Sequence, residues 1–268
     1  MILDTQLSLS DQPKLLYTFP EYDLFVLYKP AHILSHSDGR DIRDLLTWST
    51  QQSTLPAKLS LIHRLDLQTS GLVCASATVQ GAKYWGQIWA QQQVNKRYIA
   101  LVHGKTRTKG VIKRALKDGR RGRPLEAETR YRTLLHLDHC SLLEIKIIGG
   151  RKHQIRKHLQ GISHPILGDT RYASANHIKR HQAPRLCLHA IQLDLTTPLS
   201  PLYEASSQQN TKPTYHRHTI HHTHTTPSKS LNLFCPLASD FMDYLQQKAT
   251  TELLQLQKVR NALAIKNP

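Results

Sequence analysis

The chain has 268 residues, and its 36 Lys and Arg outnumber its 19 Asp and Glu, which gives a formal net charge of +17. This length is enough for one large domain with a substantial core, or for a domain with appendages. The basic excess predicts a polyanionic partner, with nucleic acid ranked above an anionic membrane surface. Aromatic residues make up only 6% of the chain, which argues against a long platform on which bases stack.

The N-terminus and the cysteines indicate the cellular compartment of the protein. Residues 1–12 lack the basic and apolar regions of a secretory signal peptide, and no apolar run approaches the length of a membrane span. Cys74, Cys140, Cys187 and Cys235 show no paired spacing, so we expect reduced thiols rather than a disulfide framework or a zinc site. The sequence therefore predicts a cytoplasmic protein that does not associate with membranes, with a monomer as the default state.

Short strands and a few helices are expected along most of the chain. Residues 1–14 are predicted to be a loose N-terminal arm, and two strands around a Pro-Glu-Tyr-Asp turn are predicted within residues 15–29. Helical spacing occurs at residues 42–48 and again at 79–93, where an apolar stripe indicates a helix that faces the core. Further strands are predicted at 72–75, 99–102, 128–135, 141–148 and 183–195. This balance indicates an α+β domain rather than a doubly wound one.

The C-terminal quarter changes in composition. Residues 199–230 are rich in Ser, Thr, Gln, Pro and His, which predicts a disordered insertion. Its five clustered histidines allow two interpretations, weak metal capture or partial protonation of an exposed loop. Residues 231–268 return to an apolar pattern and are expected to close the domain with a C-terminal helix.

The most informative stretch is residues 63–71, His-Arg-Leu-Asp-Leu-Gln-Thr-Ser-Gly, in which Arg64 lies two residues before Asp66. Apolar residues flank it on both sides, so we expect a strand that enters a tight turn, with Asp66 at its edge and residues 69–71 in the turn. Such loops on a rigid scaffold are common places for catalytic groups. The alternative is an N-cap aspartate held in a structural ion pair.

A second stretch covers residues 149–159, Gly-Gly-Arg-Lys-His-Gln-Ile-Arg-Lys-His-Leu, where a strand ends and a helix is predicted to begin. Four cations lie near a helix N-terminus, which is unfavourable unless an anion lies close by: Arg151, Lys152, Arg156 and Lys157. This local conflict indicates a site whose anion is a phosphate, a carboxylate from elsewhere in the fold, or both. The two histidines are five residues apart, which excludes a helical His-x-x-x-His metal pair.

Residues 105–132 form the most basic part of the chain. Arg120, Arg121 and Arg123 are predicted to lie in a mobile loop that can contact phosphates. A solvated charged surface is the alternative for such a run, but the excess of positive charge over the whole chain favours the phosphate interpretation.

Together these stretches resemble the RluA-type family of RNA pseudouridine synthases. The order and approximate spacing of several separated motifs agree over residues 15–198, which we therefore predict to be the catalytic domain. The matching segments are, in chain order, residues 63–71, 96–98, 150–156, 164–169, 188–190 and 234–241.

The resemblance implies a pseudouridine-synthase-like catalytic domain, with a mixed, mainly antiparallel sheet flanked by helices and loops. It implies that specific uridines in tRNA or ribosomal RNA are isomerised to pseudouridine, without a metal or an organic cofactor. In this reaction the C1′–N1 bond breaks, the uracil turns while bound, and C5 bonds to C1′. A non-catalytic RNA-binding module on the same fold is the alternative.

The resemblance also assigns residue roles. Asp66 is similar to the essential carboxylate, which either attacks covalently or stabilises a glycal-type intermediate. Arg156 matches the arginine that pairs with this carboxylate. Tyr98 matches the tyrosine that packs on the uracil and is a candidate to take a proton. Arg64 matches the residue that fills the gap left by the flipped nucleotide. The candidate RNA-binding residues are Arg64, Arg120, Arg121, Arg123, Arg151 and Lys152.

Overall fold

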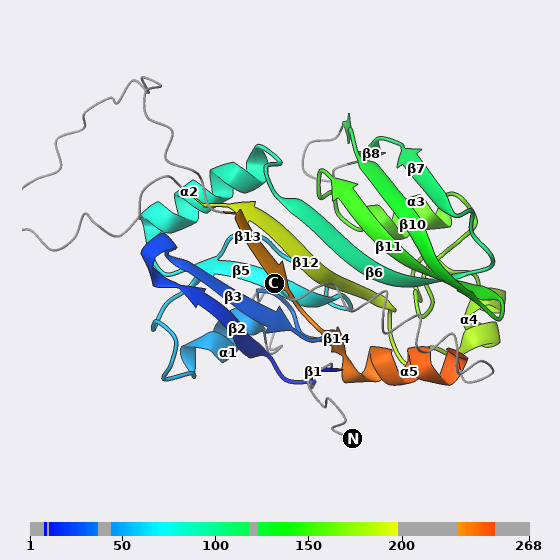
Figure 1. The fold of residues 1–268 in the computed structure, drawn as a ribbon, viewed down its shortest axis with the longest axis horizontal. Coiled ribbons are helices and arrows are strands. Elements are labelled where there is room, and N and C mark those ends of the chain that lie inside the picture. The colour runs from blue at the N-terminus through cyan, green and yellow to red at the C-terminus, as the bar shows by residue number, and fades with distance from the viewer. Residues whose placement is uncertain (1–7, 10, 37–43, 118–122, 198–229, 250–268) are drawn as a thin grey trace, which may run out of the picture.

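The computed structural model describes residues 8–9, 11–36, 44–117, 123–197 and 230–249, and a ten-stranded sheet runs through it (Figure 1). Along its main path the strands follow in the order β2 (Lys14–Phe19), β3 (Leu24–Lys29), β5 (Ser70–Ser76), β12 (Leu188–Thr196), β6 (Asn95–His103), β11 (Cys140–Ile148), β10 (Glu128–Leu137) and β7 (Lys109–Lys113). Two further strands join this path, β4 (Ser60–Leu61) beside β5 and β13 (Ser230–Phe234) beside β12. All neighbours in this sheet are antiparallel except β5 and β12, so the predicted α+β class with a mixed, mainly antiparallel sheet is confirmed.

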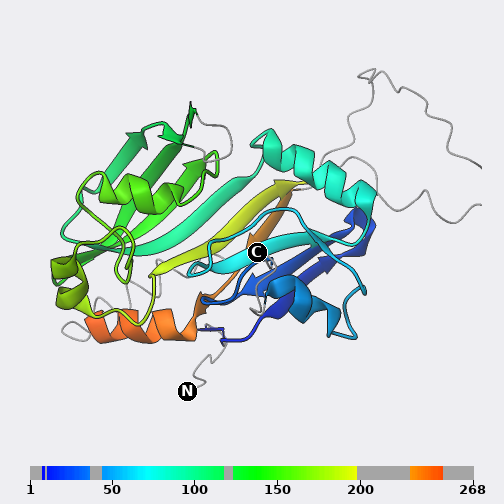
Figure 2. The ribbon, with the colours of Figure 1, turned by 180° about the vertical axis from the view of Figure 1, so that it is seen from behind.

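Within the described residues, five α-helices flank the sheet: α1 (Leu45–Thr50), α2 (Val79–Ala90), α3 (Gln154–Gln160), α4 (Ala175–His181) and α5 (Ser239–Ala249). Figure 2 shows α1 and α3 on one face of the sheet, and α5 runs along the bottom of the molecule in this view. The helix predicted at residues 42–48 begins later, because the Asp44 side chain accepts a hydrogen bond from Thr47 N at 2.9 Å and caps the first turn. The prediction of a core-facing helix at 79–93 is confirmed by α2, which buries Trp85.

Two segments far apart in the sequence form a small parallel pair, β1 (Ser8–Leu9) and β14 (Leu237–Ala238). Part of the arm predicted to be loose is therefore paired with the C-terminal segment. The predicted insertion lies outside the described residues except for Ser230, which begins β13. No helix in the described ranges is long and apolar enough to cross a bilayer.

Gly71 lies where β5 and β12 run side by side, directly opposite Ala190. Its φ is +122°, and a Cβ at this position would lie 2.6 Å from the backbone nitrogen of Ala190. Ser70 and Gly71, predicted as turn residues, thus belong to β5, and the glycine is required by a close approach between two backbones.

We expect Gly71→Ala to destabilise the protein by at least about 3 kcal/mol, because left-handed strain and a backbone clash coincide. At roughly 2–4 °C per kcal/mol, the melting temperature followed by circular dichroism should fall on the order of 10 °C. Gly86→Ala in α2 is the matched control, because its Cβ would meet nothing within 4 Å. Equal melting temperatures for the two variants would contradict the prediction.

Candidate active site

The loop of residues 62–69 carries Asp66 between β4 and β5, and backbone hydrogen bonds hold it on both sides of the aspartate. Thr69 N donates to the Asp66 carbonyl at 3.0 Å, which closes a turn just before β5. On the other side, Leu65 N donates to Ser35 Oγ at 3.1 Å, and the same hydroxyl donates to the Leu65 carbonyl at 3.0 Å. The Asp66 side chain remains 29% exposed, so the carboxylate is open to a ligand while its backbone is fixed.

Lys29 at the end of β3 is fully buried and ties two segments together. Its Nζ donates to the carbonyls of Pro30 and Ile33, each at 2.7 Å, and to Leu67 in the Asp66 loop at 3.1 Å. Burial lowers the pKa of Lys29 to about 7, although the nearby Asp66 charge opposes this shift. Sequence reasoning missed this residue, and the signal that could have found it is a lysine that ends a continuously apolar strand.

His63 anchors the other end of the same loop. Its ring stacks on Trp89 of α2 with centroids 4.4 Å apart, and its Nε2 accepts a hydrogen bond from Cys74 N at 3.1 Å. Burial lowers the pKa of His63 to about 3, so the ring is neutral at physiological pH, as an accepting nitrogen requires. Arg64, the next residue, is exposed, which fits its predicted contact with RNA.

Leu65 and Tyr98 connect the Asp66 loop to the hydrophobic core. Leu65 packs against two clusters of buried residues, one around β6, β11 and β12 and the other between α1 and β3. Tyr98 on β6 belongs to the first cluster and is 9% exposed. Burial raises the pKa of Tyr98, and the charge of Asp66 raises it further, so the phenol lies near this carboxylate and is neutral.

Arg156 on α3 makes its direct ion pair with Asp169 rather than with Asp66. Its Nε and one terminal nitrogen donate to the two Asp169 oxygens at 2.8 and 2.7 Å, and both side chains are buried. Asp169 Oδ1 also accepts from the backbone nitrogens of Arg171 and Tyr172 at 3.1 and 3.0 Å. A planar guanidinium engages one carboxylate in bidentate fashion, and Asp169 takes that place. The pairing expected between Arg156 and Asp66 is therefore not a direct one, although the Asp66 charge helps to raise the pKa of Arg156.

His153 lies between Asp66 and Tyr172, and sequence reasoning considered it only as a metal ligand. Its Nε2 is 3.7 Å from Asp66 Oδ1, and its Nδ1 is 2.8 Å from the Tyr172 hydroxyl. The guanidinium of Arg156 lies 5.0 Å from the centre of the Tyr172 ring. The residue caps α3 with a φ of +56°, a left-handed conformation that the chain pattern does not reveal.

Gln154 fixes the turn that leads from β11 into α3. Its Oε1 accepts from Gly150 N and Arg151 N, each at 3.1 Å, and its Nε2 donates to carbonyls of β10 and β11 at 2.9 and 3.2 Å. The predicted helix start is confirmed, and this buried amide sets its direction. Arg151 is half-buried beside it, whereas Lys152 is exposed.

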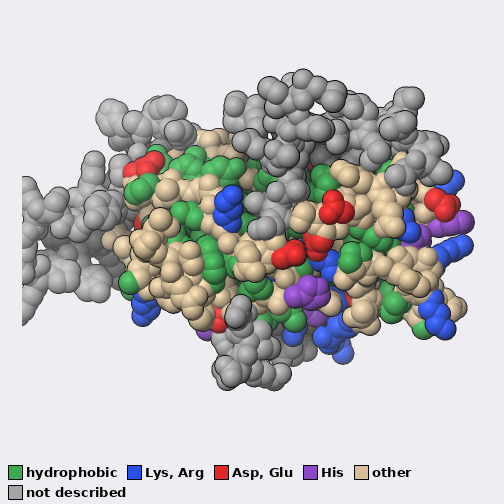
Figure 3. Space-filling view, turned by 90° about the horizontal axis from the view of Figure 1, so that it is seen from below, with side chains coloured by type: hydrophobic (Ala, Val, Ile, Leu, Met, Phe, Trp, Pro, Cys, Tyr) green, Lys and Arg blue, Asp and Glu red, His purple; other side chains and the backbone are tan. Residues whose placement is uncertain are grey.

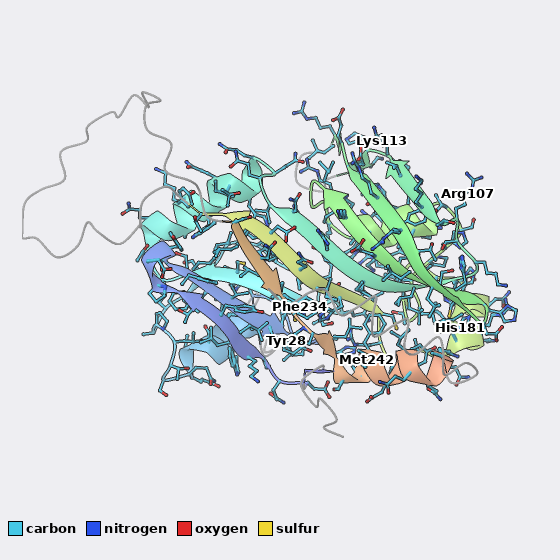
Figure 4. The ribbon with its side chains drawn as sticks, in the orientation of Figure 1. Tyr28, Arg107, Lys113, His181, Phe234 and Met242 are labelled. Carbon is cyan, nitrogen blue, oxygen red and sulfur yellow. The ribbon has the colours of Figure 1, made fainter. Side chains whose placement is uncertain are left out.

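The structure describes only some of the basic side chains that are predicted to contact RNA. Arg64, Arg123 and Lys152 are exposed, whereas Arg120 and Arg121 lie outside the described residues. Figure 4 shows Arg107 and Lys113 at the end of the sheet farthest from β2. The lower face of the molecule, by contrast, mixes acidic, basic and histidine side chains (Figure 3). Exposed basic side chains therefore occur in more than one part of the described surface.

Side chains that could ligate a metal ion are scattered in the part of the chain that the structure describes. No three His, Cys, Asp or Glu side chains there are grouped so that they could hold a metal ion. All four cysteines are buried free thiols. The predicted histidine cluster of the insertion lies outside the described residues.

Comparison with known proteins identifies the fold and then the family. The solved structure of Human RNA Pseudouridylate Synthase Domain Containing 4 superposes with a TM-score of 0.61 at 24% identity, over 87% of this chain and 92% of that one. The fold is therefore that of a pseudouridylate synthase domain. A family model described as RNA pseudouridylate synthase matches residues 23–161.

Two curated relatives place the chain more closely. Ribosomal large subunit pseudouridine synthase D of Nitrosomonas europaea is 33% identical over 206 residues, which cover 68% of this chain and 58% of that protein. Dual-specificity RNA pseudouridine synthase RluA of Escherichia coli strain K12 is 30% identical over 198 residues, which cover 70% of this chain and 89% of that protein. The chain belongs to the RluA-type family of RNA pseudouridine synthases. It spans a little over half the length of the first of these relatives.

Proposed function

We propose that this chain isomerises specific uridines in RNA to pseudouridine, with Asp66 as the catalytic carboxylate. The observation that carries the proposal is the contrast between the two carboxylates of the site. Asp169 is fully buried and engaged by Arg156, whereas the Asp66 side chain is 29% exposed on a loop whose backbone is fixed. An accessible anion beside neutral Tyr98 and the Arg156 charge suits a reaction in which a sugar carbon becomes electron-deficient.

The other residues support the steps around bond cleavage. Arg64 is exposed next to the loop and is suited to fill the space of a flipped nucleotide. Tyr98 is suited to pack against the uracil, and because burial raises its pKa, the neutral phenol is a weak proton acceptor in the resting site. After C5 bonds to C1′, the C5 proton leaves and N1 of the uracil gains one, so the product is an isomer of the substrate.

The RNA class is proposed from charge and from relatives. The printed names of relatives refer to ribosomal RNA, to tRNA and to dual specificity. The exposed basic side chains favour a compact stem-loop of tRNA or ribosomal RNA, bound largely through its phosphates and shape. The free thiols are consistent with a cytoplasmic location, and we propose a monomer.

The test is release of tritium from transcripts labelled at uridine C5, because bond formation at C5 expels that atom. Purified full chain is incubated with tRNA and ribosomal RNA transcripts, and the modified position is mapped by carbodiimide adducts and primer extension. Pseudouridine formed by the wild type but not by Asp66→Asn supports the proposal. Tight RNA binding without product from any transcript would favour the non-catalytic RNA-binding module.

RNA affinity should fall steeply with salt. With roughly four or five phosphate contacts, we expect about a hundredfold loss between about 50 and 200 mM salt. Fluorescence anisotropy with the inactive Asp66→Asn protein measures the slope. Replacing Arg120, Arg121 and Arg123 by Ala should flatten it, whereas Lys14→Ala, an exposed cation on β2, should not. If RNA affinity did not depend on salt in the Asp66→Asn protein that keeps Arg120, Arg121 and Arg123, these arginines would have no role in phosphate binding.

A further inference from the structure

We propose that His153 is a positioning residue for Asp66: its Nε2–H holds the catalytic carboxylate, while the Tyr172 hydroxyl keeps the imidazole in the tautomer that can donate. This inference rests on the proposed function and assigns a role to a side chain outside the catalytic set of Asp66, Tyr98 and Arg156.

The geometry leaves His153 as the direct partner of Asp66. Among the described side chains, His153 is the basic residue that lies within 4 Å of the Asp66 carboxylate, with its Nε2 3.7 Å from Oδ1. Arg156, which could have competed, is committed to Asp169. A separation of 3.7 Å is longer than a hydrogen bond, and such catalytic contacts commonly tighten when substrate binds.

The tautomer follows from the two neighbours of the ring. A neutral imidazole has one N–H and one accepting nitrogen. Tyr172 lies 2.8 Å from Nδ1, so its hydroxyl can donate there, and the ring proton is then on Nε2, facing Asp66. The opposite tautomer would point a nitrogen lone pair at a carboxylate, which is unfavourable. His153 precedes α3 in a left-handed conformation, with φ at +56°, and its side chain makes no capping hydrogen bond to the helix, so the ring is free to face the Asp66 loop.

The charges around the ring determine its protonation. Asp66 faces it from the loop between β4 and β5, Lys152 and Arg156 lie on either side in the chain, and Arg171 lies beside Tyr172. Desolvation lowers the pKa of His153, the Asp66 charge raises it, and the three cations lower it, with a net downward shift from 6.5. The ring is thus mainly neutral at physiological pH. Protonation at lower pH converts the hydrogen bond into a full ion pair, which makes the Asp66 carboxylate a poorer nucleophile or charge stabiliser.

The first experiment compares steady-state kinetics of the full chain on one modified transcript. His153→Ala should lower kcat by on the order of tenfold to hundredfold through misplacement of Asp66, with KM changed less than about threefold. His153→Gln should recover most of that loss, because its amide can donate to Asp66 and accept from Tyr172. His177→Gln is the matched control, a half-buried histidine on α4 whose Nδ1 lies 3.0 Å from the Ser174 hydroxyl, and it should behave as wild type.

The pH profile separates positioning from a merely structural role. In the wild type, kcat should fall on the acid side as His153 becomes protonated, below pH 6.5. Tyr172→Phe retains the ring but removes the hydroxyl that favours the neutral form, so this fall should move toward neutral pH. In His153→Gln it should disappear. The proposal would be overturned if kcat fell at the same acidic pH in all three proteins. It would also be overturned if His153→Ala had the kcat of the wild type.

A measurement without RNA keeps this inference distinct from the proposed function. Two-bond ¹H–¹⁵N spectra of the imidazoles report the tautomer of each histidine. The His153 signals are assigned as those that are lost in His153→Gln. The Nε2–H form is expected in the wild type, and a mixture with the Nδ1–H form in Tyr172→Phe. An Nδ1–H ring in the wild type contradicts the inference even if the enzyme is active, whereas an enzyme inactive on every transcript contradicts the proposed function.

Discussion

Asp66→Asn is expected to abolish pseudouridine formation while RNA affinity changes by less than about tenfold, or about 1.4 kcal/mol. Asparagine has nearly the shape of aspartate but lacks the charge that the electron-deficient sugar carbon requires. Because the Asp66 side chain is 29% exposed and its loop is held through backbone atoms, the substitution should leave the fold intact. Tritium release measures turnover, and anisotropy with the mapped stem-loop measures binding.

The control for this variant is its melting temperature, which should match that of the wild type within a few degrees. If affinity fell as much as activity, Asp66 would be a binding residue. Retained turnover would reassign the carboxylate altogether and would leave its exposed position without the proposed chemical role.

Asp169→Asn should have the largest effect on stability among the site variants. It leaves Arg156 as a buried cation without its bidentate partner, and breaking a buried ion pair in this way costs roughly 3–5 kcal/mol. For a domain of this size, the melting temperature should fall by on the order of 10 °C. Activity should fall too, because Asp169 also holds the backbone of Arg171 and Tyr172.

A double variant separates these two effects. Arg156→Met with Asp169→Asn removes the unpaired charge, so the melting temperature should recover in part, whereas activity should not. Asp138→Asn is the surface control, since that carboxylate is 82% exposed beside His139 and contributes little. If the double variant were less stable than Asp169→Asn alone, the ion-pair explanation would be wrong.

Local pattern was sufficient for most strands and for the location of the site. Short apolar runs around a turn within residues 15–29 predicted β2 and β3. The stripe at 79–93 predicted α2, because burial of one helix face imposes a period on the sequence. The polar helix α4 was missed because its one buried residue, His181, provides no apolar stripe. The pairing of β13 with β12 was not predictable either, since it joins residues on both sides of the long polar segment.

The candidate site also has some features that the local sequence indicated and others that only the tertiary structure shows. The unusual residue types of the two stretches were enough to draw attention to Asp66, Arg64 and Arg156, because cations and carboxylates concentrated at strand ends and a helix start are costly without a function. Tyr98 and the individual roles came from the resemblance to the family. Their partners were not predictable. The local conflict around α3 left a phosphate, a carboxylate or both open, and only the loop that brings Asp169 against Arg156 showed that a carboxylate is one of the anions.

By itself, then, the sequence determined the α+β class and the basic character, since these depend on composition and on periodicities within one element. Asp66 was assigned its role through the resemblance to a known family. The tertiary structure decided which groups touch. Gly71 resembles a turn residue until β12, more than a hundred residues later, packs against its backbone. His153 becomes the neighbour of Asp66 only when α3 and the loop before β5 converge. Such contacts depend on how distant segments pack, and no local pattern in the chain encodes them.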